Sequence, residues 1–296
     1  MTIDIAQIIT DRIISELEKG STPWVKPWKR LRSTPGHGMP YNPVSGTVYS
    51  GMNHIWLSMM QGAYPTPYWL TLKHANQIGG HVRANEKGTP IVAFKMVRKE
   101  SLVNGKKEIS AYPMIKHHYV YNIAQCEDIT IPALPTEPEP TFNPDSSVMA
   151  LVDRLGLAEG LHHGGDSAFY SPTRDFISMP PMAAFNSANG YHSTLLHESV
   201  HATGHKTRLN RDFGKRFGSE SYAFEELVAE LGAAMLCAHC GIDGEMQANH
   251  VAYIANWLKV LRNDKKAILT ASAKAQQALD FLTKAKQVEE TESLAA

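Results

Sequence analysis

The residues best suited to chemistry in this 296-residue chain lie in the run TLLHESVHATGH, residues 194–205. His197 and His201 are four positions apart, so a helix would place both imidazoles on one face, where they can bind a metal ion. Glu198 lies beside them without competing as a ligand, and it is placed to take a proton from water held by that ion. This HExxH pattern predicts a metal-dependent hydrolytic centre with Glu198 as its base.

The third metal ligand has to come from elsewhere in the chain. A histidine at position 207 would complete one class of zinc site, but that position is Thr207. The alternative is a carboxylate on a following helix, and the run FEELVAELGAA supplies three glutamates. Glu226 and Glu230 are one helical turn apart, so we expect Glu226 to bind the metal and Glu230 to orient a ligand histidine. Glu225 remains the alternative ligand.

Zinc, one ion per chain, suits two imidazoles and a carboxylate with a fourth position open to water. The helix that carries the two histidines is expected to end near Gly204, in a left-handed conformation. We expect His205, just beyond that end, to lie at the rim of the site, where it can stabilise an oxyanion or replace a ligand. His162 and His163 are predicted to lie together in a loop, with no assigned role.

The two halves of the chain differ in charge, although the whole is neutral. Residues 1–126 contain 15 Lys and Arg against 7 Asp and Glu, a balance of +8, and residues 127–296 have a balance of −8. A basic half joined to an acidic half indicates a polyanion, such as nucleic acid, as the partner of the first half. Mild charge segregation also occurs in two-domain proteins without such a partner.

Aromatic residues are interleaved with the cations of the basic half. Four of the five tryptophans lie there, two of them in the run WVKPWKRLR. Single-stranded nucleic acid is bound by this combination, because bases stack on rings while cations follow the phosphates. Trp56 and Trp69 are expected on helices in a small core instead. The predicted nucleic-acid contacts are Trp24, Lys26, Trp28, Lys29, Arg30, Arg32, Tyr41, Asn42, Tyr49, Asn53, Lys73, Arg83 and Lys87.

The elements that must position these residues form an α+β fold of two domains. A mixed α+β domain, residues 1–126, is predicted to contain an amphipathic helix ending at Gly20, helices over 54–62 and 69–80, and a hairpin turning at Asn104-Gly105. Residues 127–145 are rich in proline and predict an extended linker. Residues 146–296 predict a mainly helical domain with a strand pair within 167–180.

The remaining sequence features indicate the cellular compartment of the protein. Cys126, Cys237 and Cys240 are too few for a disulfide framework, and the last two are expected to be small buried thiols. The first 20 residues have neither the basic nor the apolar segment of a signal peptide. No apolar stretch is long enough to cross a membrane. We therefore expect a cytoplasmic protein.

Several motifs follow one another along nearly the whole chain. The first half contains TPWVKPW, YNPVSGTVYSGMN, YWLTLKHANQIGGHVRANEKGTPIV and YVYNIAQ; HESVHATGHKTRLNRDF and EELVAEL follow the Pro-rich segment. In this order the motifs resemble the ArdC family of plasmid antirestriction proteins. One departure is VRANEKGT, where Asn85 stands in place of the glycine that the family tends to have before the glutamate.

The resemblance implies an N-terminal single-stranded-DNA-binding domain, also found in primases of conjugative plasmids, and a C-terminal zincin-like metallopeptidase domain. It implies a protein that protects incoming plasmid DNA from host restriction endonucleases during conjugation. Two alternatives stay open: a DNA-binding shield whose zinc cleaves nothing, and a DNA-activated protease acting on DNA-bound proteins. An intact Glu198 favours catalysis, because a structural zinc site has no need of a base.

Overall fold

The computed structural model describes two regions of the chain on either side of the Pro-rich segment. It describes residues 4–20, 39–60, 64, 66–103, 106–129, 144–213, 220–242 and 250–284, and for 94–103, 106–115, 144–145 and 250–253 the backbone alone. Most of the predicted linker therefore lies outside the described residues.

The N-terminal region mixes helices and strands, as the sequence predicts. Its helices are α1 (Ile5–Glu18), α2 (Gly51–Met60), α3 (Leu72–Gln77) and the 3-10 turn η3 (Ile123–Gln125). Its strands are β1 (Tyr41–Asn42), β2 (Thr47–Val48), β3 (Trp69–Leu70), β4 (His81–Val82), β5 (Thr89–Val103), β6 (Lys106–Asn122) and β7 (Cys126–Glu127). β1 pairs with β2, and β4 with β7.

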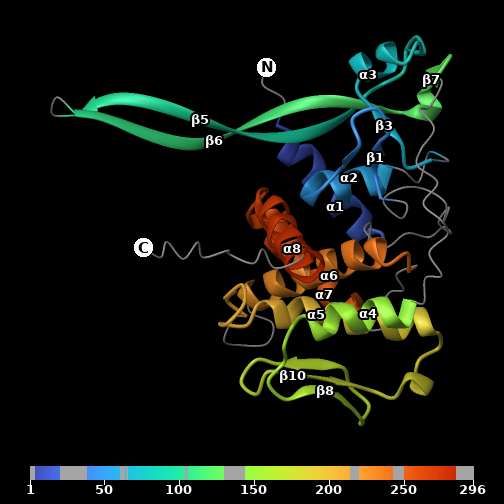
Figure 1. Cartoon of the computed structure of the whole chain (residues 1–296), viewed down its shortest axis with the longest axis vertical. Helices are drawn as coiled ribbons and strands as arrows, with labels where there is room; N and C mark the ends of the chain where they lie inside the picture. Colours follow the sequence, from blue (N-terminus) through green and yellow to red (C-terminus); the bar gives the residue numbers. More distant parts are fainter. Residues whose placement is uncertain are drawn as a thin grey trace, which may run out of the picture.

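β5 and β6 form a long antiparallel hairpin that extends away from the body of the molecule (Figure 1). The register runs from Thr89 opposite Val120 to Val103 opposite Lys106, so the predicted hairpin is confirmed, although the two turn residues lie outside the described part. β3 pairs with the other edge of β6 and completes the sheet order β3–β6–β5. The base of the hairpin is thus part of a sheet, and its far end is a two-stranded ribbon.

The predicted helix over residues 69–80 is wrong at its start. Trp69 and Leu70 form β3, and both side chains are fully buried. The helix begins only after Thr71, whose hydroxyl accepts a hydrogen bond from the amide of His74 at 3.1 Å. A two-residue strand is too short to leave a recognisable period, and its pairing with β6 outweighs local helix propensity.

The C-terminal region is mainly helical, as predicted. Its helices are α4 (Pro144–Asp153), the 3-10 turn η4 (Met182–Ala184), α5 (Ala188–Thr203), α6 (Glu220–His239), α7 (His250–Asn263) and α8 (Ala267–Thr283). Cys237 and Cys240 are buried free thiols, which confirms that prediction. Gly232 of α6 allows the close approach of α5, because a Cβ there would lie 2.8 Å from Cγ2 of Val200.

A three-stranded sheet packs against α5. The predicted strand pair is confirmed as β9 (Phe169–Ser171) and β10 (Phe176–Met179), which are antiparallel. β8 (Gly160–His163) pairs with β10 in parallel, so the prediction that His162 and His163 lie in a loop is wrong. The strand has only four residues, begins with Gly160 and is followed by Gly164, both with positive φ, so its composition is typical of a loop.

A buried ion pair fixes the β9–β10 hairpin to the segment that follows α5. Arg208 donates to both carboxylate oxygens of Asp175, and its Nε donates to the carbonyl of Ala202 at 2.7 Å. The Tyr170 hydroxyl donates to the same carboxylate at 2.7 Å. Burial would raise the pKa of Asp175, but Arg208 and Tyr170 hold it below its ordinary value.

The N-terminal and C-terminal regions share one hydrophobic core. α1 packs on α7, and α2 packs on α8. The Thr10 hydroxyl donates to the carbonyl of Lys265 at 2.8 Å, and the amide of Gly51 donates to the side chain of Gln276 at 2.8 Å. The division into 1–126, 127–145 and 146–296 stays a prediction, but its two outer parts are in contact.

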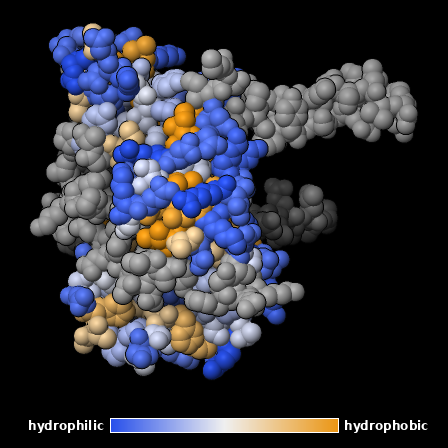
Figure 2. Space-filling view, turned by 180° about the vertical axis from the view of Figure 1, so that it is seen from behind, coloured by the Kyte–Doolittle hydropathy of each residue, from blue (hydrophilic) through white to orange (hydrophobic). Residues whose placement is uncertain are grey.

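Seen from behind, the described surface is mostly polar, with apolar groups in a band through the middle and in patches at the lower end (Figure 2). The lower end is where β8 and β10 lie, opposite the β5–β6 hairpin (Figure 1). Phe169 of β9 and Met182 of η4 are exposed apolar side chains of this sheet region, 46% and 44% accessible.

Candidate metal centre

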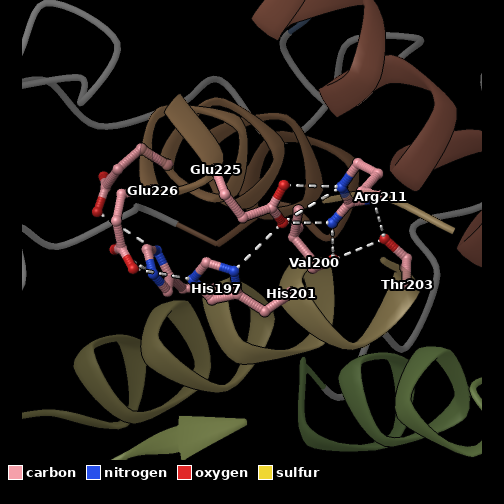
Figure 3. A network of polar contacts seen from close by, with 8 residues as sticks. His197, Val200, His201, Thr203, Arg211, Glu225 and Glu226 are labelled. Carbon is pink, nitrogen blue, oxygen red and sulfur yellow. Dashed lines mark hydrogen bonds and ion pairs between the residues drawn. The ribbon is translucent and has the colours of Figure 1, made fainter. Parts of the chain in front are cut away.

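α5 and α6 lie side by side and bring the predicted ligands together (Figure 3). Nε2 of His197 lies 3.6 Å from Oε2 of Glu226, and Nε2 of His201 lies 3.5 Å from Oε1 of the same carboxylate. One donor atom from each of the three side chains lies within 4.8 Å of the other two. Two imidazole nitrogens facing one buried carboxylate are a donor set that fits a divalent metal ion.

The outer ring nitrogens of both histidines face carboxylates as well. Nδ1 of His197 lies 3.3 Å from Glu230, and Nδ1 of His201 lies 3.4 Å from Glu225. Such partners fix the tautomer and the orientation of a ligand histidine, so that Nε2 is left to face the metal. Glu225 thus lies behind His201, whereas Glu226 lies between the two Nε2 atoms.

Arg211, which no pattern in the sequence indicates, holds Glu225 in place (Figure 3). Its Nε donates to Oε2 of Glu225 at 3.0 Å, and one terminal nitrogen donates to Oε1 at 2.8 Å. The guanidinium also donates to the Thr203 hydroxyl at 2.8 Å and to the carbonyl of Val200 at 2.6 Å. Both charged side chains are almost completely buried. Because Arg211 is itself bound to Val200 and Thr203 of α5, its bonds to Glu225 hold that carboxylate in a fixed orientation.

Gly204 ends α5 in a different way from the one predicted. Its φ is −75°, so it is right-handed and the expected left-handed conformation is wrong. A Cβ at this position would lie 2.8 Å from the ring of Phe213 and 3.0 Å from the guanidinium of Arg211. The glycine is therefore needed for space, because the chain after α5 folds back closely enough to bring Arg211 beside the helix end.

Electrostatics couple the histidines to the surrounding carboxylates. Burial alone would lower the pKa of His197, but Glu226 and Glu230 raise it well above its ordinary value. Burial likewise opposes the charge on His201, and Glu225 and Glu226 raise its pKa. Burial would raise the pKa of Glu226, yet the two histidines lower it to about 2. The cluster thus has a charged carboxylate ready to bind a cation.

Of the other two side chains predicted for this site, Glu198 lies beside the histidines and His205 lies beyond the end of α5. Glu198 is buried beside the two histidines, and its charge contributes to the raised pKa of each. His205 lies past the end of α5, where its Nδ1 contacts the Thr207 hydroxyl at 2.8 Å, and it does not belong to the group of potential ligands found among the described residues. A role for His205 in orienting ligands or stabilising an oxyanion stays a prediction.

The predicted nucleic-acid contacts fall into three groups: those that are at least partly buried or bonded within the N-terminal region, those that are exposed, and those outside the described residues. In the first group, Asn42 caps the turn after β1, Tyr49 is buried, and Asn53 hydrogen-bonds both backbone groups of Val92. Arg83 donates to Glu86 and to the carbonyl of Ala124, while Tyr41 is half-buried. Lys73 and Lys87 are exposed. Those outside the described residues are Trp24, Lys26, Trp28, Lys29, Arg30 and Arg32.

Contact with DNA stays a prediction for all of these side chains. The expected core role of Trp56 and Trp69 is confirmed by their burial, although Trp69 lies on a strand. Asn85 has a φ of 66°, so it adopts the left-handed conformation that a glycine would take in this turn. Among the described residues, no helix is both long and apolar enough to cross a membrane.

Comparison with known proteins matches both regions. Residues 3–121 match the N-terminal domain of anti-restriction factor ArdC, and residues 148–274 match a zincin-like metallopeptidase. The protein y4eC of Sinorhizobium fredii is 33% identical over 288 residues, which cover 94% of this chain and 91% of that protein. A DNA primase TraC of Escherichia coli is 36% identical over 95% of this chain, but the chain spans only 27% of the primase.

Two solved structures have the same fold over nearly their whole length. The metal-free crystal structure of the antirestriction protein ArdC from plasmid R388 superposes with a TM-score of 0.77 at 36% identity, covering 95% of this chain and 97% of that one. The Mn(II)-bound form superposes with a TM-score of 0.75 at 35% identity. The C-terminal region is thus a zincin-like domain, for which a bound metal ion is expected.

Proposed function

Because this chain belongs to the ArdC antirestriction family, we propose that it binds single-stranded DNA with its N-terminal region and protects incoming plasmid DNA from host restriction endonucleases. We further propose that its C-terminal region carries one zinc ion in a centre of the metallopeptidase type. The observation that carries the second part is the single carboxylate of Glu226 facing Nε2 of both His197 and His201.

His197, His201 and Glu226 would hold the zinc ion, and Glu230 and Glu225 would orient the two histidines from behind. A bound zinc ion supplies Lewis-acid chemistry, which polarises a carbonyl oxygen and makes water more acidic. Glu198, buried next to His197, would accept a proton at its carboxylate and return it to the leaving amine. This division of roles is that of a peptidase.

The ligand assignment is tested by the metal content of purified variants. We expect about one zinc per chain, removable by chelator. His201→Ala should abolish zinc retention, and Glu226→Ala should weaken it substantially. Glu225→Ala should reduce affinity less, because that carboxylate acts only through His201. Full affinity in Glu226→Ala together with loss in Glu225→Ala would show that Glu225 is the ligand.

The link between catalysis and protection is tested with Glu198→Ala. This change removes the proton acceptor and leaves the three metal ligands, so zinc content and DNA binding should be unchanged. Protection by occupancy of the strand should also persist, while any peptide cleavage should be lost. The measurements are restriction of transferred DNA and cleavage of host proteins in the same variant. Loss of protection with intact folding and DNA affinity would favour a DNA-activated protease.

A further inference from the structure

One row of rings on β6 lies outside the core and outside the metal centre. His117, Tyr119 and Tyr121 are alternate residues of the strand, so their side chains lie on the same face of the sheet. Val120 and Asn122, on the other face, are completely buried. The three rings, which we call the β6 ring row, therefore lie on the face of β6 opposite Val120 and Asn122.

Two rings of the β6 ring row are exposed and contact each other. Tyr119 is 40% exposed, His117 is exposed and Tyr121 is half-buried. The rings of His117 and Tyr119 meet edge to face, with centroids 6.0 Å apart and planes at 85°. A large exposed tyrosine beside a second exposed ring is a surface on which flat groups can stack.

Gly88, just before β5, makes room for this row. A Cβ at Gly88 would lie 2.9 Å from Cζ of Tyr121 and 3.0 Å from Cβ of Tyr119. The ring of Tyr121 therefore lies over the bare backbone of Gly88, where a side chain would displace it.

A cation borders the row. Lys87 precedes Gly88, is exposed, and has no ion-pair partner within the described part of the chain. Lys116 is also exposed, but it alternates with His117 and therefore lies on the opposite face of β6. The neighbouring carboxylate, Glu86, already accepts from Arg83 at 2.8 Å and from Gln125 at 3.0 Å. The surface thus presents rings together with positive charge that is not neutralised by the protein.

We propose that the β6 ring row is a base-stacking surface for a single DNA strand, with Lys87 contacting its phosphates. This inference rests on the proposed DNA-binding function and names the residues that perform it. Single strands expose the faces of their bases, whereas a duplex hides them, so rings bordered by a cation favour the single strand. The row lies at the opposite end of the molecule from the β8–β10 sheet (Figure 1).

The test uses the full chain and a fluorescein-labelled oligothymidylate of about 20 nucleotides, with binding followed by fluorescence anisotropy. Tyr119→Ala should weaken binding about 5- to 150-fold, and Tyr119→Phe should retain it, because the stacking face is kept. The salt dependence of binding should not change in Tyr119→Ala, because no phosphate contact is removed. Phe169→Ala is the matched control, since it removes an equally exposed ring from the other end.

The outcomes separate this inference from the proposed function. A wild-type chain that does not bind the strand contradicts both. A wild-type chain that binds, with Tyr119→Ala unaffected or weakened no more than Phe169→Ala, contradicts the stacking surface alone. Equal affinity for a duplex of the same length contradicts the preference for single strands. The last measurement is the oligomeric state of the chain without DNA, from sedimentation. If the wild type is a dimer and Tyr119→Ala is a monomer, the row is a contact between copies of the chain, which would contradict the stacking surface.

Discussion

The charged side chains around His201 are buried and held by partners on every side, whereas the lysines that border β6 are exposed and have no ion-pair partner within the described part of the chain. Arg211 and Glu225 have side chains only 3% and 4% accessible and are joined by hydrogen bonds from Nε and a terminal nitrogen of the arginine. Lys87 and Lys116 are exposed at the surface.

This difference follows from what each region would have to bind. A metal centre needs donor atoms at defined positions, so its supporting charges are removed from water and must be compensated within the protein. A polyanion brings its own charge, and cations that stay hydrated and unpaired can exchange small ions for phosphates. Buried charges should therefore be costly to disturb, and exposed ones should matter only when the partner is present.

The largest expected effect comes from breaking the buried pair. Arg211→Met leaves the Glu225 carboxylate buried without its cation, so the free energy of unfolding should fall by about 3–5 kcal/mol. Urea unfolding of the purified variant measures this loss. A variant as stable as the wild type would show that solvent reaches this carboxylate.

A double variant that removes both charges of the buried pair separates its effect on stability from its effect on zinc affinity. The double variant Arg211→Met with Glu225→Leu should recover most of the lost stability, because no buried charge remains uncompensated. Its zinc affinity should nevertheless stay about 10- to 100-fold below that of the wild type, since Nδ1 of His201 has lost its carboxylate. Competition with a chelator measures this affinity, and a normal value would show that Glu225 does not orient His201.

A smaller and pH-dependent effect is expected at the second buried pair. Asp175 has a φ of 53°, which asparagine tolerates, so Asp175→Asn removes the charge and retains the turn. We expect a loss of about 1.5–3 kcal/mol in the free energy of unfolding at neutral pH, because the hydrogen bonds to Arg208 are no longer between charges.

The pH dependence follows from the lowered pKa of Asp175 in the folded protein. The charged carboxylate stabilises the folded state above its unfolded pKa of about 3.9, and this contribution is lost as the pH falls through the lower folded pKa. The stability difference between wild type and Asp175→Asn should thus be constant above about pH 5 and shrink below about pH 4. Urea titrations at several pH values measure it; a constant difference throughout would contradict the lowered pKa.

The smallest effect on stability is expected from the exposed cations. Lys87→Ala should change the free energy of unfolding by less than about 0.5 kcal/mol. The slope of log affinity for single-stranded DNA against log salt should nevertheless decrease by about 0.7. Lys259→Ala is the control, because Lys259 is just as exposed but paired with Glu220 at 3.3 Å. An unchanged salt slope in Lys87→Ala would show that Lys87 does not contact the phosphates of the DNA.

The core of the metal centre was accessible from sequence because it depends on spacing along single helices. His197 and His201 are one turn apart on α5, and Glu226 and Glu230 are one turn apart on α6. Arg211 was not accessible, since it lies in the segment after α5 and reaches Glu225 only because Gly204 allows the chain to fold back. The position of Glu225 behind His201 likewise depends on how the two helices pack, which no local pattern encodes.

In the fold, too, the elements predicted from the sequence are those that depend on local residues, and the elements that depend on distant partners were not predicted. The Asn104-Gly105 turn and the alternating runs beside it predicted the long hairpin correctly. β3 and β8 were missed, because strands of two and four residues are defined by their partners and not by a period of their own. The row of rings on β6 was also missed, since its exposure depends on which face the rest of the N-terminal region covers.

The packing of α1 against α7 joins residues that are synthesised far apart in time. Thr10 and its partner Lys265 are separated by 255 positions, which a ribosome takes roughly 13 to 51 s to translate at ~5–20 residues per second. Throughout that time the apolar face of α1, with Ile9 and Ile13, has no helix α7 to cover it. The N-terminal region therefore completes its packing only after α7 (His250–Asn263) has been synthesised, and a nascent chain that stalls before residue 250 would present this face to chaperones.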